Sequence, residues 1–234
     1  MSTPNKMTAM CGNCGEPHGI DVWNGINIGE HPELKEQVKD GSLFVWECPH
    51  CGGRNLAPYQ TLYHDPAEHL MVWHIPENTV TEEQITSVTA QLKNLEGYVL
   101  RRVDDIGSLI EKVNIFDAGL DDVVLEMCKY VTKMELTGAS SETTEPSPDA
   151  EGASLPSAPE KTEAIRQAPF KFYKLDRPDN DLIFSYPLDG EMRGVKIGFQ
   201  VYGDCQGIIS RNPVMTPDPG FARIDAGWLE SFFG

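Results

Sequence analysis

Hydrophobic and polar positions alternate along the first third of the chain in the manner of short β-strands. Runs rich in Val, Ile, Phe, Trp and Tyr predict strands over 20–28, 42–47, 55–63 and 69–75. The last two runs flank a turn at residues 64–66, so we expect them to form a hairpin. Between the first two runs, Pro32 at a helix-start position, Leu34 and Val38 four residues apart, and Gly41 as a stop predict one short helix.

From Thr81 the apolar spacing becomes helical. Thr81 and Gln84 have the spacing of a capping box, and Gly97 stops the helix that they begin. A strand is expected over 98–103, and two more helical stripes follow it. A pair of aspartates precedes each of these stripes. Carboxylates are favourable at helix N-termini, so we interpret these aspartates as helix caps rather than as catalytic bases. The pairs are Asp104/Asp105 and Asp121/Asp122.

The segment 138–169 is dominated by Ala, Ser, Thr, Glu and Pro, and such a composition predicts a flexible linker because it buries little apolar surface. After it, strand-like runs at 170–175, 182–186 and 195–202 predict a small antiparallel sheet that the aromatic tail from Phe221 covers. We therefore expect four parts, namely a β-rich N-terminal domain, a mainly helical extension packed on it, a linker and a small β module. Their boundaries are 1–78, 79–137, 138–169 and 170–234.

Two short cysteine motifs, CGNCG and CPHCG, carry the clearest chemistry. A Cys-x-x-Cys turn places two sulfurs on one side of a tight loop, and two such turns supply the tetrahedral sulfur set that zinc prefers. A glycine after each second cysteine, Gly15 and Gly52, permits the positive φ that aims backbone amides at the sulfurs. The sequence therefore predicts a structural zinc site in an α+β protein with a zinc-ribbon-like N-terminal domain. The expected ligands are Cys11, Cys14, Cys48 and Cys51.

Other metal and redox chemistry is less well supported by the residues. CPHC is also a redox tetrapeptide, but Gly52 and Gly53 break the helix that a thioredoxin-like motif needs. Four cysteines leave no coordination position for water, which disfavours a catalytic zinc. A string of HDxxxH type from His64 to His69 contains Pro66, so we interpret it as a turn in which Asp65 bonds the backbone ahead of it.

The charge and composition of the chain limit the kinds of molecule that it is expected to bind. The chain carries 36 acidic and 19 basic residues, a net charge of −17, and no cluster of Lys or Arg accompanies the cysteine motifs. Such a domain repels a phosphate backbone, so nucleic acid is a disfavoured partner and another protein is the expected one. There is no membrane-length apolar run and no signal-peptide pattern, which predicts the cytoplasm. In that reducing compartment cysteines are thiols or metal ligands, and the isolated Cys128 and Cys205 are expected to be buried apolar residues.

The order of three segments is similar to the CpXC domain family of bacteria and archaea: CGNCG, then INIGEHPELKEQVKDGSLFVWECPHCG, then PYQTLYHD. The resemblance extends over about the first 135 residues and implies the same four cysteines as zinc ligands. Gly12 stands where the family turn usually has proline, which changes the rigidity of the turn and removes no ligand. The family implies no substrate and no catalytic residue.

We therefore expect a non-enzymatic zinc-binding protein whose folded surface binds another protein. Two alternatives stay open at this point. One is a zinc ribbon that binds nucleic acid, by analogy of fold alone, and it requires a basic face that the residue counts hide. The other is an enzyme whose cleft forms between the domains from residues far apart in the sequence.

Overall fold

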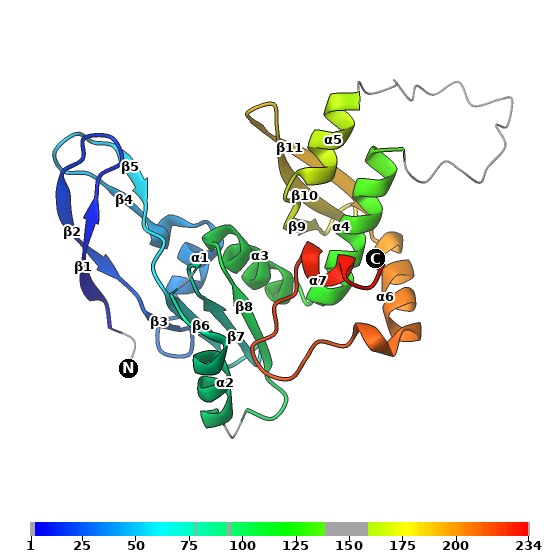
Figure 1. The fold of residues 1–234 in the computed structure, drawn as a ribbon, viewed down its shortest axis with the longest axis horizontal. Helices are drawn as coiled ribbons and strands as arrows, with labels where there is room; N and C mark the ends of the chain where they lie inside the picture. The colour runs from blue at the N-terminus through cyan, green and yellow to red at the C-terminus, as the bar shows by residue number, and fades with distance from the viewer. Residues whose placement is uncertain (1–2, 78, 93–94, 139–158, 234) are drawn as a thin grey trace, which may run out of the picture. The chain divides into compact units, whose positions relative to one another are not determined.

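The structure is a computed structural model that describes residues 3–77, 79–92, 95–138 and 159–233 (Figure 1). It is an α+β protein, as the sequence predicts, and it divides into two compact units. The first unit combines Met1–Leu120 with Thr216–Trp228, and the second combines Asp121–Met215 with Leu229–Gly234. The first unit is therefore built from two separate stretches of the chain. Within the described residues, no helix has the length and apolar character needed to cross a membrane.

Among its described residues ahead of residue 120, the first unit holds eight strands and three helices. The strands are β1 (Asn5–Met10), β2 (Pro17–Val22), β3 (Gly25–Asn27), β4 (Val45–Glu47), β5 (Arg54–Leu56), β6 (Thr61–Asp65), β7 (Leu70–His74) and β8 (Val99–Val103). The helices are α1 (Leu34–Lys39), α2 (Glu82–Gln91) and α3 (Ile106–Asp117), and a 3₁₀ turn, η1, covers Ser42–Phe44.

Two antiparallel ribbons and one larger sheet organise this unit. β1 pairs with β2, and β4 pairs with β5, each as a two-stranded ribbon. The four-stranded sheet has the order β3-β6-β7-β8, with β6 and β7 antiparallel and the two outer pairs parallel. Every residue of β7 is buried because both faces of the sheet are covered. One face carries a core with α1, α3 and β2, and the other carries a second core with α2.

The helix starts predicted at Thr81, Asp105 and Asp121 are confirmed, whereas α1 begins at Leu34, two residues after the predicted start at Pro32. At α2, Thr81 and Gln84 form the capping box that their spacing indicates. At α3, the Asp105 carboxylate accepts a hydrogen bond from the Ser108 amide at 2.8 Å. In the second unit Asp121 caps α4 (Asp122–Leu136) in the same way, accepting from the Val123 amide at 2.8 Å. These carboxylates satisfy amides that a helix leaves unbonded at its first turn.

Three predicted strands are shorter than expected, because polar and turn residues interrupt them. The run 20–28 is split into β2 and β3 at Asn24, which bonds the backbone of Gln60 through its side chain at 2.9 Å. The run 55–63 is split into β5 and β6 around Pro58, which has no N–H to donate to a ladder. The run 42–47 begins as η1 and becomes a strand only at β4.

The second unit contains the predicted antiparallel sheet, with the order β11-β10-β9. Its strands are β9 (Lys171–Asp176), β10 (Asp181–Leu188) and β11 (Glu191–Gly198), and its helices are α4, α5 (Pro159–Gln167) and α6 (Gln200–Arg211). Aromatic pairs hold the sheet, including Phe170 stacked on Tyr186 with ring centroids 4.3 Å apart. The strand expected over 195–202 ends at Gly198, and the remaining residues begin α6.

Two expectations about the second half of the chain differ from the structure. The predicted linker 138–169 lies largely outside the described residues, but its last part forms α5, where Ile165 is buried. The tail was expected to cover the C-terminal sheet, whereas Phe221 packs in the first unit against Trp73, with ring centroids 5.3 Å apart. An aromatic residue in a tail predicts burial, but it does not indicate which core will accept it.

Candidate metal centre

Each cysteine motif forms a six-residue turn that joins the two strands of a ribbon. Residues 11–16 connect β1 to β2, and residues 48–53 connect β4 to β5. The two turns have the same backbone hydrogen bonds. In each turn the amide of the first cysteine donates to the carbonyl oxygen five residues later, and the carbonyl oxygen of that cysteine accepts from the amide four residues later. The bonds are Cys11 N to Glu16 O (3.0 Å), Gly15 N to Cys11 O (2.9 Å), Cys48 N to Gly53 O (2.9 Å) and Gly52 N to Cys48 O (2.8 Å).

Glycine is required at the fifth position of each turn. Gly15 has φ of 75° and Gly52 has φ of 68°, which lie in the left-handed region that residues with a Cβ rarely adopt. Gly53 is restricted for a different reason, because a Cβ there would lie 3.3 Å from Cys51 Sγ. The glycines after the cysteines therefore set the shape of both turns, as the sequence predicts.

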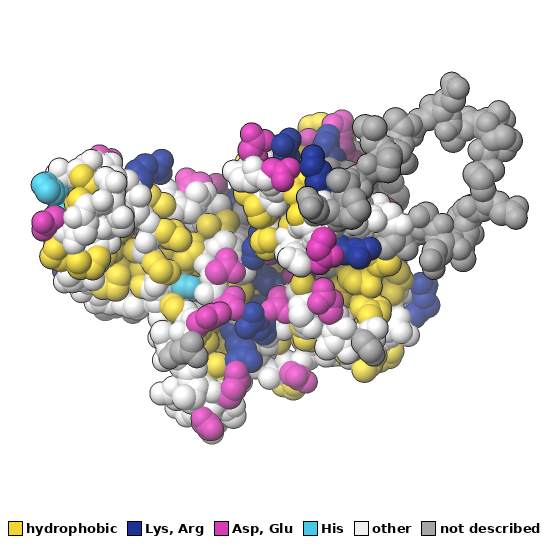
Figure 2. Space-filling model, turned by 45° about the horizontal axis from the view of Figure 1, so that its top comes forward, with side chains coloured by type: hydrophobic (Ala, Val, Ile, Leu, Met, Phe, Trp, Pro, Cys, Tyr) yellow, Lys and Arg dark blue, Asp and Glu magenta, His cyan; other side chains and the backbone are white. Residues whose placement is uncertain are grey.

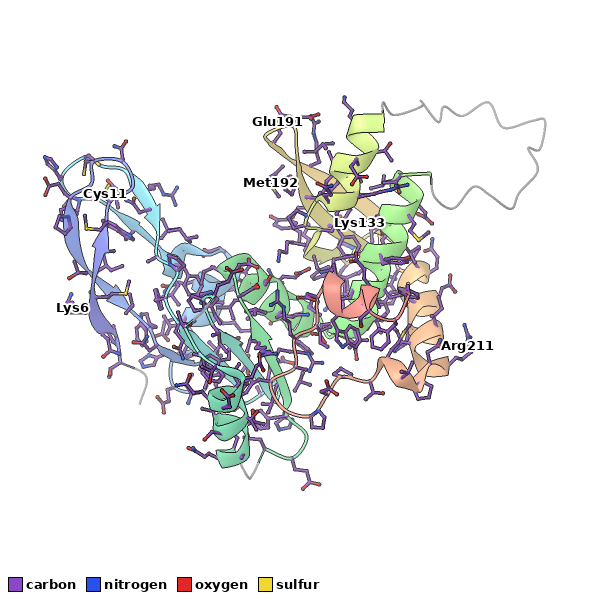
Figure 3. All side chains as sticks on the ribbon, viewed as in Figure 1. Lys6, Cys11, Lys133, Glu191, Met192 and Arg211 are labelled. Atoms are coloured by element: carbon purple, nitrogen blue, oxygen red, sulfur yellow. The ribbon has the colours of Figure 1, made fainter. Side chains whose placement is uncertain are left out.

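The two turns bring all four cysteine sulfurs together. The sulfur atoms of Cys11, Cys14, Cys48 and Cys51 all lie within 4.8 Å of one another. Cys11 Sγ is 3.6 Å from Cys51 Sγ, and Cys14 Sγ is 3.7 Å from Cys48 Sγ. A tetrahedron with metal–sulfur bonds of about 2.3 Å has edges of about 3.8 Å. The four side chains are thus close enough to hold a metal ion. Figure 3 labels Cys11 near the turn between β1 and β2, with other sulfur atoms beside it.

Nitrogen-bearing side chains surround the sulfurs. The Asn13 side-chain amide lies 3.3 Å from Cys51 Sγ, and that of Asn55 lies 3.5 Å from Cys11 Sγ. The oxygen of the Asn55 side chain accepts from the Gly12 amide at 2.8 Å, so this residue of the second ribbon also holds the first turn. Such outer groups orient thiolates and disperse their negative charge.

His18 is a neighbour of the centre that the sequence analysis missed. Its Nε2 lies 3.2 Å from Cys48 Sγ, and its ring contacts Trp46 edge to face with centroids 5.9 Å apart. His18 is on β2, two residues beyond the end of the first turn, but it reaches a cysteine of the other turn. Only the pairing of the two turns creates this contact, so no local pattern in the sequence could have indicated it.

The thiols perturb one another strongly. The backbone amide of Cys14, with further hydrogen bonds from Asn13 and Asn55, lowers the pKa of Cys11 to about 6 although desolvation opposes this change. The Glu16 amide lowers the pKa of Cys14, but desolvation of its sulfur by neighbouring atoms and contacts with the three other sulfurs outweigh it and raise that pKa to about 12. The Asn13 amide lowers the pKa of Cys51. Four sulfurs this close can all be thiolates only with a cation between them, which fits a metal ion.

Access to the centre is unequal. Cys11 and Cys48, the first cysteine of each turn, are only 2% and 1% exposed, whereas Cys14 and Cys51 are exposed. A donor set of four thiolates fills the coordination of a tetrahedral ion and leaves no position for water or substrate. Chemically the arrangement can hold an ion and join two ribbons.

The histidine and aspartate of the HDxxxH string have structural roles. Asp65 accepts hydrogen bonds from the Ala67 and Glu68 amides at 3.1 and 3.3 Å, as predicted for a turn. Its other oxygen lies 3.1 Å from Lys35 Nζ, and His64 lies 3.2 Å from the Tyr98 hydroxyl. Across the part of the chain that the structure describes, the four cysteines form the one group of His, Cys, Asp or Glu placed to hold a metal.

The remaining two cysteines lie in the second unit. Cys128 on α4 and Cys205 on α6 are 0% and 1% exposed, which agrees with the expectation of buried apolar residues. They also contact each other, and the hydrogen bond between them raises the pKa of Cys128 and lowers that of Cys205. The two cysteines are 77 positions apart in the sequence, so no local pattern predicts that they contact each other.

These features define a class: an α+β protein in which two cysteine turns on paired β-ribbons form a centre able to hold a metal. A family model described as CpXC protein matches residues 9–129, which is more than half of the chain. The chain belongs to this family. Searches of curated proteins and of solved structures found no match.

Proposed function

We propose that this chain is a zinc-binding protein in which Cys11, Cys14, Cys48 and Cys51 hold one structural Zn²⁺. The supporting observation is the convergence of four sulfurs within 4.8 Å, on turns of matching backbone geometry. Zinc is the ion that most often takes four cysteine ligands in tetrahedral geometry. A closed set of this kind supports folding rather than catalysis, so the proposed role is not enzymatic.

In this proposal the ion holds the turn ends of the two ribbons together, while Ile20 and Val22 of β2 pack in the hydrophobic core of the unit. Each ribbon has two strands, and isolated two-stranded ribbons are marginally stable in water. An ion that joins both turns links segments separated by 33 residues. Apparent binding free energies of structural zinc in small domains are about 10–16 kcal/mol, which is larger than the stability of most domains.

Each of the two ribbons carries an exposed apolar side chain that could contact a protein partner. Met10 at the end of β1 and Leu56 at the end of β5 are 63% and 58% exposed, and Figure 2 shows hydrophobic side chains gathered over this end of the unit. The chain is acidic overall, which opposes the binding of a phosphate backbone. We propose that the exposed apolar side chains of the ribbons contact another protein, in the cytoplasm, where cysteines that form no disulfide would remain reduced.

Metal analysis and a binding experiment test the two parts of the proposal. The full chain should contain zinc, and Cys48→Ser should lose it. For the binding role, immobilised wild-type chain and the variant Met10→Ser/Leu56→Ser are compared as baits in a native lysate. A protein captured by the wild type and lost with the double variant supports the role, whereas capture unaffected by the variant contradicts it. Salt-sensitive binding to DNA or RNA would instead support the nucleic-acid alternative.

A further inference from the structure

The C-terminal segment 216–228 returns to the first unit and lies along the outer edge of its four-stranded sheet. Ala222 forms a parallel bridge with Arg101 of β8, and its carbonyl accepts from the Arg102 amide at 3.0 Å. An extended segment that adds to a sheet edge is one of the recurring ways in which proteins bind peptides. Here the peptide belongs to the same chain.

An aromatic side chain anchors this segment. Phe221 is 5% exposed and packs in the core between α2 and the sheet. Its neighbours are Met71, Trp73, Ile75 and Ile85. Just before it, Gly220 has φ of 98°, and a Cβ there would lie 2.7 Å from Thr89 Cγ2 on α2. The segment is therefore seated in a groove whose walls are α2 and β8.

An arginine two positions after the aromatic anchor adds a charge contact. Arg223 Nη2 lies 2.6 Å from the Asp104 carboxylate, which follows β8 directly. Asp225, at the end of the seated stretch, holds the Arg223 Nε at 2.5 Å. The groove thus recognises two features of the segment: an aromatic ring in an apolar pocket and a guanidinium against an acidic wall.

The seated segment leaves part of the groove open. A cavity of about 790 Å³ lies between α2 and the segment, lined by Ile85, Thr86, Arg102, Phe221 and Trp228 among others. This volume is typical of ligand-binding clefts. The main-chain pairing to β8 consists of a single bridge, whereas the ladder between β7 and β8 covers five residue pairs. Elements with few backbone bonds open locally before the rest of a structure.

We propose that the groove between α2 and β8 is a peptide-binding site, occupied in this chain by its own segment 219–225. Its partner would be an extended segment of another protein that carries an aromatic residue and, two positions later, an arginine. The inference rests on the proposed role in binding another protein, places a second binding surface away from Met10 and Leu56, and is independent of the metal centre. The chain's own segment then acts as an internal competitor, which lowers the apparent affinity for the partner.

A labelled peptide with the sequence of residues 216–228 tests this inference on the full chain. In Phe221→Ala/Arg223→Ala the internal segment loses both anchors, while Trp73, Ile85 and Asp104 remain in the groove. The peptide should bind this variant with an apparent Kd about tenfold or more below that for the unmodified chain. A peptide with the same two substitutions should not bind, and adding Asp104→Ala to the variant should weaken binding. Fluorescence anisotropy measures each Kd.

Failure of the peptide to bind a folded variant, or equal binding of the substituted peptide, would overturn the inference. If the double variant does not fold, amide exchange in the unmodified chain gives a second test. The Arg102 amide, which donates to the Ala222 carbonyl, should exchange faster than the amides of β7. Exchange of the Arg102 amide as slow as that of the β7 amides would contradict the inference. Zinc content is measured in the same samples, so loss of the metal centre is distinguished from failure of the groove.

Discussion

The sulfur atoms of Cys11 and Cys51 lie 3.6 Å apart although 40 residues separate them in the chain. The complementary pair, Cys14 and Cys48, is 3.7 Å apart. In each pair a buried first cysteine of one turn faces an exposed second cysteine of the other. The two turns are therefore arranged reciprocally, and each short sulfur contact joins both ribbons. Loss of any one cysteine should open the centre and separate the ribbons.

Cys48→Ser removes a buried sulfur from the centre, and we expect loss of bound metal and of ordered structure in the ribbons. The free energy of metal binding exceeds the stability that two small ribbons can supply, which is the reason for this effect. Metal content and the amide exchange of β1, β2, β4 and β5 measure the two consequences.

Cys128→Ser is the matched control, because this cysteine is equally buried and lies outside the centre. Its metal content should equal that of the wild type. Metal bound at wild-type levels by Cys48→Ser, with the ribbons still protected from exchange, would contradict the structural role of the ion.

Gly52→Ala should destabilise the second turn by about 1–2 kcal/mol, because its φ of 68° is unfavourable for a residue with a Cβ. Gly19→Ala is the control, since Gly19 lies within β2 and an added Cβ meets nothing within 4 Å there. Urea unfolding measures both stabilities. Equal midpoints for the two variants would show that the left-handed conformation at Gly52 is not needed.

Asn55→Ala should weaken metal binding about tenfold, since outer-shell substitutions commonly cost 10- to 100-fold in affinity. The side chain contacts Cys11 Sγ and the Gly12 amide together, so its loss affects a ligand and the turn that holds it. Competition with a chromophoric chelator measures the affinity, and Asn5→Ala, whose side chain bonds Asn24, is the comparison. Unchanged metal affinity in Asn55→Ala would show that the Asn55 side chain does not support the metal centre.

Asp117 should contribute a pH-dependent part of the stability. Its carboxylate lies 2.7 Å from both Lys35 Nζ and Lys39 Nζ. Burial alone would raise the pKa of Asp117, but hydrogen bonds from the two ammonium groups outweigh it and lower that pKa. A carboxylate with a lowered folded pKa stabilises the protein above its unfolded pKa, and this contribution is lost as the pH falls through the folded pKa.

We therefore expect Asp117→Asn to be less stable than the wild type by about 1 kcal/mol near neutral pH, a modest value because the pair is partly exposed to solvent. The difference should shrink on acidification and vanish below both pKa values. Urea unfolding at a series of pH values measures it, and metal release in acid affects both proteins alike. A difference that stays constant with pH would show that the ion pairs are not its source.

Local patterns were sufficient to predict the cysteine turns, the helix caps and most elements. Thr81 with Gln84 and the carboxylates of Asp105 and Asp121 act within one helical turn, so the sequence around them determines their role. The same holds for Asp65, which bonds amides two and three residues ahead. Chemistry confined to a few neighbouring residues can be predicted from sequence alone.

Features that depend on distant pairing were missed. β1 has a weak strand pattern and forms because it pairs with β2 over six residues. α6 contains Gly203 and Gly207, which obscure a helical pattern, and it is held partly by the Tyr202 hydroxyl accepting from the Asp121 amide at 2.8 Å. Phe221 joins a core formed more than a hundred residues earlier. In each case tertiary contacts outweigh local propensity.

The most direct test of the central claim is the metal content of the purified full chain, measured by inductively coupled plasma mass spectrometry beside a thiol count under denaturing conditions. The account predicts one zinc per chain, with the four cysteines of the two turns unreactive until the metal is chelated. Folded protein that contains no metal, or in which these four cysteines are joined as disulfides, would contradict it.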